Sequence, residues 1–187
     1  IQPIYSARQK QATWALWIKI VIACIPAAVL GLLFDDWMEA HLYNAYVVAA
    51  TLIIYGVLFI ALENSSITAN PSITKVGHVS TKTALFIGLF QLLSLVPGTS
   101  RSGSTILGAM VLGCSRGVAA EFSFFLGIPV MFGASFLKLV KYGFHYTGNE
   151  VAILVVGMVV AFIVSILAIK FLLGYIKNND FKAFGVY

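Results

Sequence analysis

The stretch Pro97-Gly98-Thr99-Ser100-Arg101-Ser102-Gly103-Ser104-Thr105 determines how this chain is interpreted. It places several hydroxyl groups around one arginine, between the apolar segments 84–96 and 106–112. A charged side chain at the middle of a membrane costs about 2.5–3.5 kcal/mol on insertion scales. A simple polar loop between two helices leaves that arginine unexplained. We therefore predict a buried anion site, for a phosphate group, held inside a membrane.

The composition places the chain in a membrane. Of its 187 residues, 60% are hydrophobic and only 10% are charged, and the mean hydropathy is +0.94. A soluble domain carries about 25% charged residues. The net charge of +5 then indicates basic cytoplasmic loops and acidic lipid headgroups, and no nucleic-acid partner is predicted. Cys24 and Cys114 are too few for a disulfide framework or a metal site, so we predict no metal ligands.

Hydropathy predicts four membrane-spanning helices, over 12–34, 42–62, 117–137 and 151–169. Each has close to the roughly 20 residues that a helix needs to cross a bilayer. Pro26 should kink the first helix, and the acidic residues 35, 36 and 39 should form the connection to the second. Lys138 and Lys141 should lie in the loop before the last helix. We interpret residues 1–187 as one integral membrane domain that is incomplete at both ends.

The segments on either side of the polar stretch are too short to cross. Segment 81–96 reaches only about 24 Å as a helix, and segment 106–113 is shorter. Short segments interrupted by Gly and Pro are the best sequence indication of a buried site in a membrane protein. We therefore expect a re-entrant helical hairpin over 81–113, with the polar stretch at its tip. The predicted fold class is an all-α polytopic membrane bundle with a re-entrant, broken helix pair.

Lys and Arg residues concentrate in cytoplasmic loops of membrane proteins. If the hairpin enters the membrane and returns, only Lys138 and Lys141 lie outside. The basic residues that then lie on the cytoplasmic side are at 8, 10, 75, 82, 116, 170, 177 and 182. A full crossing by the hairpin would put the last lysines outside, so the hairpin fits the rule better. His78 is expected to be a solvated loop histidine rather than a base.

The polar stretch offers three kinds of donor to an anion. Arg101 carries a planar fork of N–H groups that matches a phosphate bidentately. A helix that restarts near Thr105 would point its free N–H groups and its positive dipole end at the same place. Fixed donors of this kind also stabilise the charge that develops in phosphoryl transfer. The other contributors are hydroxyls or closely approaching backbone groups, at Gly98, Ser100, Ser102, Gly103 and Ser104.

Two function classes stay open at this point. The spacing from Gly98 to Gly103 is similar to that of a Walker A loop, but Ser104-Thr105 occupies the place of Lys-Ser/Thr and no strand precedes it, which excludes an NTPase. The chain is either a lipid diphosphate phosphatase or part of a transporter or channel that binds an anionic lipid or phosphate at a broken helix. A structural membrane subunit would leave the buried arginine unexplained. Glu121 should either pair with Arg116 or Arg101 or act directly in catalysis.

Residues 97–106, followed by Gly113-Cys114-Ser115-Arg116 and Ala120-Glu121-Phe122-Ser123-Phe124, closely resemble the undecaprenyl-diphosphate phosphatase family, the bacitracin-resistance proteins. The resemblance covers essentially the whole chain. It implies a multi-pass hydrolase of the bacterial inner membrane that converts undecaprenyl diphosphate to undecaprenyl phosphate and phosphate, recycling the lipid carrier of peptidoglycan synthesis. It also implies an inverted-repeat fold with two re-entrant helix pairs, a site open to the periplasm, and polyprenyl diphosphate and membrane lipids as partners.

The resemblance also assigns roles to individual residues. Activity in the family depends on a divalent cation, Mg²⁺ or Ca²⁺, and the family's glutamate-rich first motif, with two serines and a histidine, has no match in these residues. We therefore predict that the cation ligands lie elsewhere and that residues 1–187 alone are inactive. By motif match, the catalytic residues are Arg101, Ser100 and Thr105, the diphosphate is held by Ser102, Gly103, Ser104 and Gly98, and supporting charge comes from Glu121 and Arg116.

Overall fold

The computed structural model describes residues 7–143, 146–176 and 179–186, without the side chains of residues 7–9, 35 and 184. In these ranges the chain forms helices and no strand, which confirms the expected all-α class. The helices are α1 (Ala7–Leu42), α2 (Ala45–Glu63), α3 (Thr81–Gln91), α4 (Arg101–Val111), α5 (Arg116–Tyr142), α6 (Gly148–Tyr175) and α7 (Lys182–Val186), with 3₁₀ turns η1 (Val76–His78) and η2 (Leu92–Leu95).

Four of these helices contain stretches long and apolar enough to cross a membrane: Lys10–Phe34, Ala45–Glu63, Arg116–Tyr142 and Gly148–Tyr175. They match the four predicted spans, and the chain is a multi-pass membrane protein. The most apolar is α6, with a mean hydropathy of 3.1 over its best window. Its apolar side chains are exposed all round the helix, as lipid contact requires.

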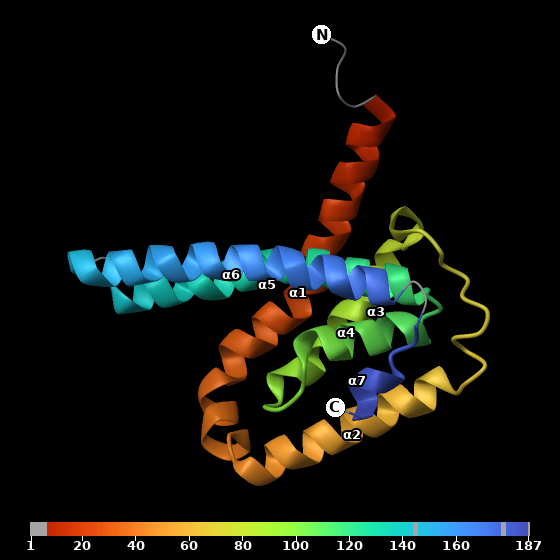
Figure 1. The fold of residues 1–187 in the computed structure, drawn as a ribbon, viewed down its shortest axis with the longest axis horizontal. Helices are drawn as coiled ribbons and strands as arrows, with labels where there is room; N and C mark the ends of the chain where they lie inside the picture. The colour runs from red at the N-terminus through yellow and green to blue at the C-terminus, as the bar shows by residue number, and fades with distance from the viewer. Residues whose placement is uncertain (1–6, 144–145, 177–178, 187) are drawn as a thin grey trace. The chain divides into compact units, whose positions relative to one another are not determined.

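Two predicted loops are helical instead. The acidic residues 35, 36 and 39 continue α1 to Leu42, because no Gly or Pro interrupts this stretch and Trp37 stacks on His41 one turn later. Lys138 and Lys141 lie in the last turns of α5, where long side chains can still reach water. Pro26 stays inside α1, which is bent in Figure 1. Lys177, used in the orientation argument, lies outside the described residues.

The chain divides into two compact units, one formed by 1–130 with 180–187 and the other by 131–179. Whether they make up one membrane domain stays a prediction. In the first unit α3 packs against α1 and α4, and α7 packs against α2 (Figure 1). The contact between α1 and α3 is backbone to backbone, because a Cβ on Gly88 would lie 2.2 Å from the carbonyl oxygen of Ala23. Small residues allow such close approach of membrane helices.

The polar stretch joins η2 to α4, so α3, η2 and α4 form the expected helical hairpin. Gly98 turns the chain with a φ of 86°, in the left-handed region that favours glycine. The same residue touches α2, because its Cβ would lie 2.3 Å from Thr51 Oγ1 and 2.8 Å from Val48 Cα. Conformation and space therefore both require glycine at this turn. The re-entry of the hairpin into a bilayer stays a prediction.

The polar segment between α2 and α3 is tied to the corner between α4 and α5. Ile73 N–H donates to the Gly113 carbonyl at 2.9 Å, and Ser115 N–H donates to the Ile73 carbonyl at 2.9 Å. Ser72 adds a side-chain hydrogen bond to the same Gly113 carbonyl at 3.3 Å. His78 is exposed in this segment, as expected of a loop histidine.

The second unit contains the end of α5 and the whole of α6. Its connection ends in a capping box, in which Thr147 N–H donates to Glu150 Oε2 at 2.7 Å and Glu150 N–H donates to Thr147 Oγ1 at 3.4 Å. This reciprocal pair satisfies free donors at the start of the helix and fixes where α6 begins.

Candidate functional site

The first turn of α4 carries the central residues of the polar stretch. The helix begins at Arg101, one turn before the expected restart at Thr105. Ser100 makes this possible as the N-cap, because its Oγ accepts the Gly103 N–H at 3.2 Å and its carbonyl accepts the Ser104 N–H at 2.9 Å. Arg101 and Ser102 therefore stand at the positive end of the helix dipole, where anions are stabilised.

Two hydroxyls are accessible at this helix end. Ser100 is exposed and Ser102 is half-buried, and their Oγ atoms lie 3.3 Å apart. The structure therefore places Ser100, predicted as catalytic, beside Ser102, predicted to bind the diphosphate, at the accessible start of α4. Gly103 lies just behind them, close to the Phe59 ring of α2.

Ser104 and Thr105 lie deeper, with exposures of 0% and 1%. Ser104 Oγ donates to the Arg101 carbonyl at 3.0 Å, and Thr105 Oγ1 lies 3.0 Å from the same oxygen. Thr105 Oγ1 also lies 2.7 Å from Ser123 Oγ of α5. Both hydroxyls are thus bonded inside the protein in this conformation. Their predicted contacts with a diphosphate, and the catalytic role of Thr105, stay predictions.

The Arg101 side chain extends from α4 toward α5 and α1. A Cβ on Gly127 of α5 would lie 2.6 Å from Nη2 of Arg101, and Cys24 of α1 is close enough for an electrostatic interaction. The Nη1 atom is buried and has no hydrogen-bond partner within the described part of the chain. Buried polar atoms in folded proteins are almost always hydrogen-bonded, so this guanidinium has donor capacity left for a ligand.

Helix α2 forms one wall beside the polar stretch. Thr51 Oγ1 donates to the Pro97 carbonyl at 2.9 Å, and the Tyr55 side chain lies close to that of Thr99. With Phe59, these residues follow one another at four-residue spacing on a single face of α2. Sequence reasoning missed this wall, although hydroxyls repeated at helical spacing in an apolar span were the signal available.

A buried ion pair holds the other end of α2. Arg116 Nε donates to both carboxylate oxygens of Glu63, at 2.9 and 3.0 Å, and Nη2 contacts the same carboxylate. The Phe181 N–H donates to Glu63 Oε1 at 2.9 Å. The Glu63 side chain is fully buried, whereas 34% of the Arg116 side chain is exposed. Sequence reasoning missed Glu63, because only the fold brings residues 63 and 116 together.

Pairing with Arg116 was one expectation for Glu121, but Arg116 pairs with Glu63 instead. Residues five apart on a helix point in different directions, whereas residues three or four apart share a face. Glu121 is exposed and forms no ion pair with any residue that the structure describes. The supporting or catalytic role of Glu121 stays a prediction, and so does the contribution of Arg116 charge to the site.

An apolar pocket of about 260 Å³ borders the buried part of α4. It is enclosed by α2, the segment after it, α3, η2 and α4. Its lining is almost entirely hydrocarbon, apart from Tyr55, Ser65 and Ser104. The apolar lining residues are Leu58, Ala61, Leu62, Ile67, Phe90, Leu93, Leu107 and Val111. An apolar cavity therefore lies directly beside the polar stretch.

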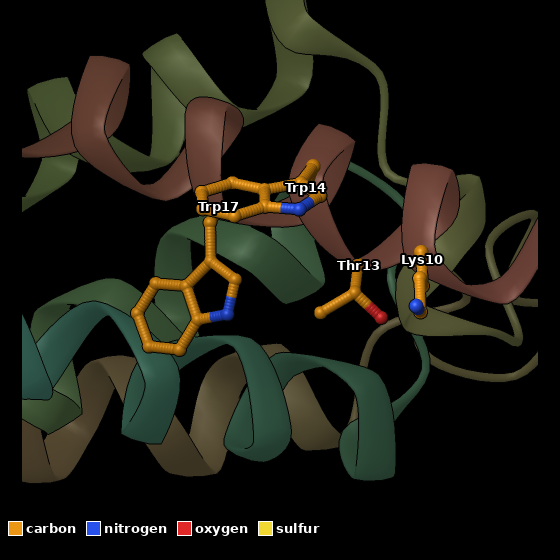
Figure 2. A pocket seen from close by; sticks show the side chains of 4 residues that line it. All are labelled: Lys10, Thr13, Trp14 and Trp17. Carbon is orange, nitrogen blue, oxygen red and sulfur yellow. The ribbon is translucent and has the colours of Figure 1, made fainter. Parts of the chain in front are cut away.

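A second pocket, of about 580 Å³, lies along the first turns of α1 (Figure 2). It is lined by Lys10, Thr13, Trp14 and Trp17. Trp17 extends away from α1 and meets Phe125 of α5 edge to face, with ring centroids 6.2 Å apart. Tryptophan and lysine at the end of an apolar helix are typical of the membrane–water interface.

The divalent cation implied by the family resemblance finds no ligand set in the described ranges. Ions such as Mg²⁺ and Ca²⁺ bind carboxylate, carbonyl and water oxygens. No group of three or more His, Cys, Asp or Glu residues comes together in residues 7–143, 146–176 and 179–186. The residues around Arg101 are hydroxyls and a cation, which suit an anion rather than a metal ion.

Comparison with known proteins gives one consistent result. The chain is 57% identical over 189 residues to an undecaprenyl-diphosphatase of Streptococcus thermophilus strain CNRZ 1066, covering 100% of this chain and 66% of that protein. It is 59% identical over 178 residues to the undecaprenyl-diphosphatase of Acetivibrio thermocellus, covering 95% and 65%. With that of Enterococcus faecalis strain V583 it shares 54% identity over 188 residues, covering 99% and 68%.

The chain thus spans about two thirds of the length of these curated relatives. A family model described as bacitracin resistance protein BacA matches residues 1–187. That match extends over the hairpin, the polar stretch and both helices that contact Arg101. The chain therefore belongs to the bacitracin resistance protein BacA family.

Proposed function

We propose that this chain carries the diphosphate-binding side of an undecaprenyl-diphosphate phosphatase. The observation that supports this most directly is the first turn of α4, which carries Arg101 together with the accessible hydroxyls of Ser100 and Ser102. The buried Nη1 of Arg101, which has no hydrogen-bond partner among the described residues, adds unused donor capacity. The relatives named undecaprenyl-diphosphatase support the same reaction and substrate.

In the proposed reaction, water supplies the oxygen that replaces the bridging oxygen at the terminal phosphorus of the diphosphate. The anhydride P–O bond breaks, and undecaprenyl phosphate and inorganic phosphate leave. The Arg101 guanidinium binds the diphosphate oxygens and offsets the negative charge that develops on the departing phosphate. Ser100, Ser102 and the first N–H groups of α4 orient the same oxygens. The described residues do not fit a metal ion, and no step is assigned to one.

The apolar pocket beside Ser104 accounts for the lipid part of the substrate. Its hydrocarbon lining suits the isoprene units nearest the diphosphate, which would otherwise have to leave the membrane interior. In the inner membrane, the hairpin formed by α3, η2 and α4 would be re-entrant, as the Lys and Arg distribution predicts. The family resemblance implies that the site would open toward the periplasm. A second, inverted hairpin would complete the site.

Phosphate release tests the proposal. The full-length protein that contains this chain, purified in detergent, should release inorganic phosphate from undecaprenyl diphosphate. Arg101→Ala should reduce release to the background rate while the thermal unfolding midpoint stays unchanged. Absence of hydrolysis by the unsubstituted protein would overturn the proposal. If Arg101→Ala spares hydrolysis but stops movement of the lipid across vesicle membranes, the chain is part of a transporter instead.

A further inference from the structure

The guanidinium of Arg101 occupies a space that exists only because residue 127 is glycine. A Cβ at Gly127 would lie 2.6 Å from Nη2, 3.6 Å from Cζ and 3.7 Å from Nη1 of Arg101. A contact of 2.6 Å is well inside van der Waals distance, so any larger side chain at 127 must displace a neighbour. Gly127 itself is buried within α5.

The atom that must move is the far end of a flexible side chain. By contrast, a Cβ at Gly88 would collide with the backbone carbonyl of Ala23 at 2.2 Å, which no rotamer change relieves. Substitution at Gly127 can therefore be absorbed by swinging the guanidinium away from α5. The expected consequence is a misplaced Arg101 in a protein that still folds.

A second contact fixes Gly127 opposite Arg101. Thr105 lies one turn after Arg101 on α4, and Ser123 lies one turn before Gly127 on α5. Their hydroxyl oxygens are 2.7 Å apart in a buried environment. Because the two helices are paired at 105 with 123 and at 101 with 127, the hydroxyl pair sets their register at the guanidinium.

The donor pattern of Arg101 indicates that this placement serves ligand binding. A buried N–H without an acceptor costs about 1–3 kcal/mol, so packing alone would favour a partner for Nη1. In the described part of the chain it has none. Gly127 holds the guanidinium in a position where one nitrogen stays available.

We propose that Gly127 is a positioning residue for Arg101, with the hydroxyl pair formed by Thr105 and Ser123 setting the register. This proposal rests on the proposed phosphatase function. Gly127 is buried and faces the guanidinium, so its proposed action is through Arg101. Displacement of a binding group by about 1 Å can cost about 100-fold in rate, and Gly127→Ala should lower kcat/KM by that order.

Gly133 provides a matched control. It lies in the same helix, and a Cβ there would meet no atom of the described residues within 4 Å. In the full-length protein, Gly127→Ala should lower kcat/KM for undecaprenyl diphosphate by about 100-fold, whereas Gly133→Ala should not change it. Because the fold is expected to survive, both variants should keep the thermal unfolding midpoint of the unsubstituted protein. Equal kcat/KM for the two variants would overturn the positioning role.

A double substitution separates positioning from packing. Lys has no forked second nitrogen, so in an Arg101→Lys background the additional change Gly127→Ala should have little further effect on inorganic pyrophosphate binding or turnover. If Gly127 served only packing, Gly127→Ala would reduce pyrophosphate binding or turnover equally with Arg101 and with Arg101→Lys, and it would lower the unfolding midpoint. Either result would overturn the proposal. The two proposals can fail separately. If the unsubstituted protein shows no phosphatase activity, the proposed function is refuted. If that protein nevertheless binds pyrophosphate more tightly than Gly127→Ala does, the positioning role of Gly127 still holds.

Discussion

Glu63 and Arg116 lie 53 residues apart and are joined by two hydrogen bonds from one Nε, at 2.9 and 3.0 Å. The carboxylate is fully buried at the end of α2, and the arginine opens α5. A buried charge without its partner is strongly unfavourable, so this pair fastens two membrane-crossing helices at one end. The pair lies outside the polar stretch, so its removal should act directly on stability.

Arg116→Ala should destabilise the protein by on the order of 3 kcal/mol, because it leaves the Glu63 carboxylate buried without a cation. The measurement is thermal unfolding in detergent, with Lys82→Ala as the control, since Lys82 is an exposed lysine in α3. An Arg116→Ala midpoint equal to that of the control would contradict the importance of the pair.

Thr105→Val should destabilise the fold by about 1–3 kcal/mol, because it strands the buried Ser123 hydroxyl that lies 2.7 Å away. Thr105→Ser keeps that hydrogen bond and should keep most of the stability. Ser102→Ala, at the accessible end of α4, should weaken diphosphate binding with no change in unfolding. If Thr105→Val has the same free energy of unfolding as the unsubstituted protein, the hydroxyl pair does not contribute to stability.

Burial raises the pKa of the Cys114 thiol to about 11, from an ordinary value of 9.0. Only the thiolate reacts with alkylating reagents, and its fraction at pH 8 is then about 100-fold below that of an ordinary cysteine. In a Cys24→Ala variant, alkylation of Cys114 should be slow at pH 8 and should accelerate about tenfold per pH unit up to pH 11. Rapid modification at pH 8 without detergent denaturation would show that the thiol is not buried.

Ile67→Trp should fill the apolar pocket from its rim, where Ile67 is about half exposed. KM for undecaprenyl diphosphate should rise by about 10-fold, the equivalent of one or two lost methylene contacts. KM for a diphosphate with a short water-soluble tail should stay unchanged. Ile153→Trp, on the exposed surface of α6, is the control. An equal effect on both substrates would place the lipid tail elsewhere.

Local patterns predicted most of the helices. Length and hydropathy indicated the four spans, and the Gly and Pro residues around the polar stretch indicated the hairpin. Helix ends were less predictable: Asp36 and Glu39 resemble loop residues by charge, yet nothing in the backbone stops α1 there. The start of α4 was predicted near Thr105 but lies at Arg101, because Ser100 caps the helix through the Gly103 N–H although its neighbours are typical loop residues.

The composition of the site was predictable, but its geometry was not. Residue type alone indicated an anion site at Arg101 and its neighbouring hydroxyls, which stays a prediction. The direction of each side chain depends on helix packing, which buries Ser104 and Thr105 and leaves Ser100 and Ser102 accessible. Partners that are distant in sequence, such as Glu63 for Arg116 and Gly127 for Arg101, follow only from the fold.

The hydrogen bond from Phe181 to Glu63 bears on how the protein is made. The two residues are 118 positions apart, and α5 and α6 are synthesised between them. Chains emerge from the ribosome from the N-terminus onward, and contacts between distant residues close late. The Glu63 carboxylate therefore lacks the Phe181 N–H donor until α5 and α6 have been synthesised. The hydrogen bonding of the first unit is therefore complete only after α6 has been synthesised.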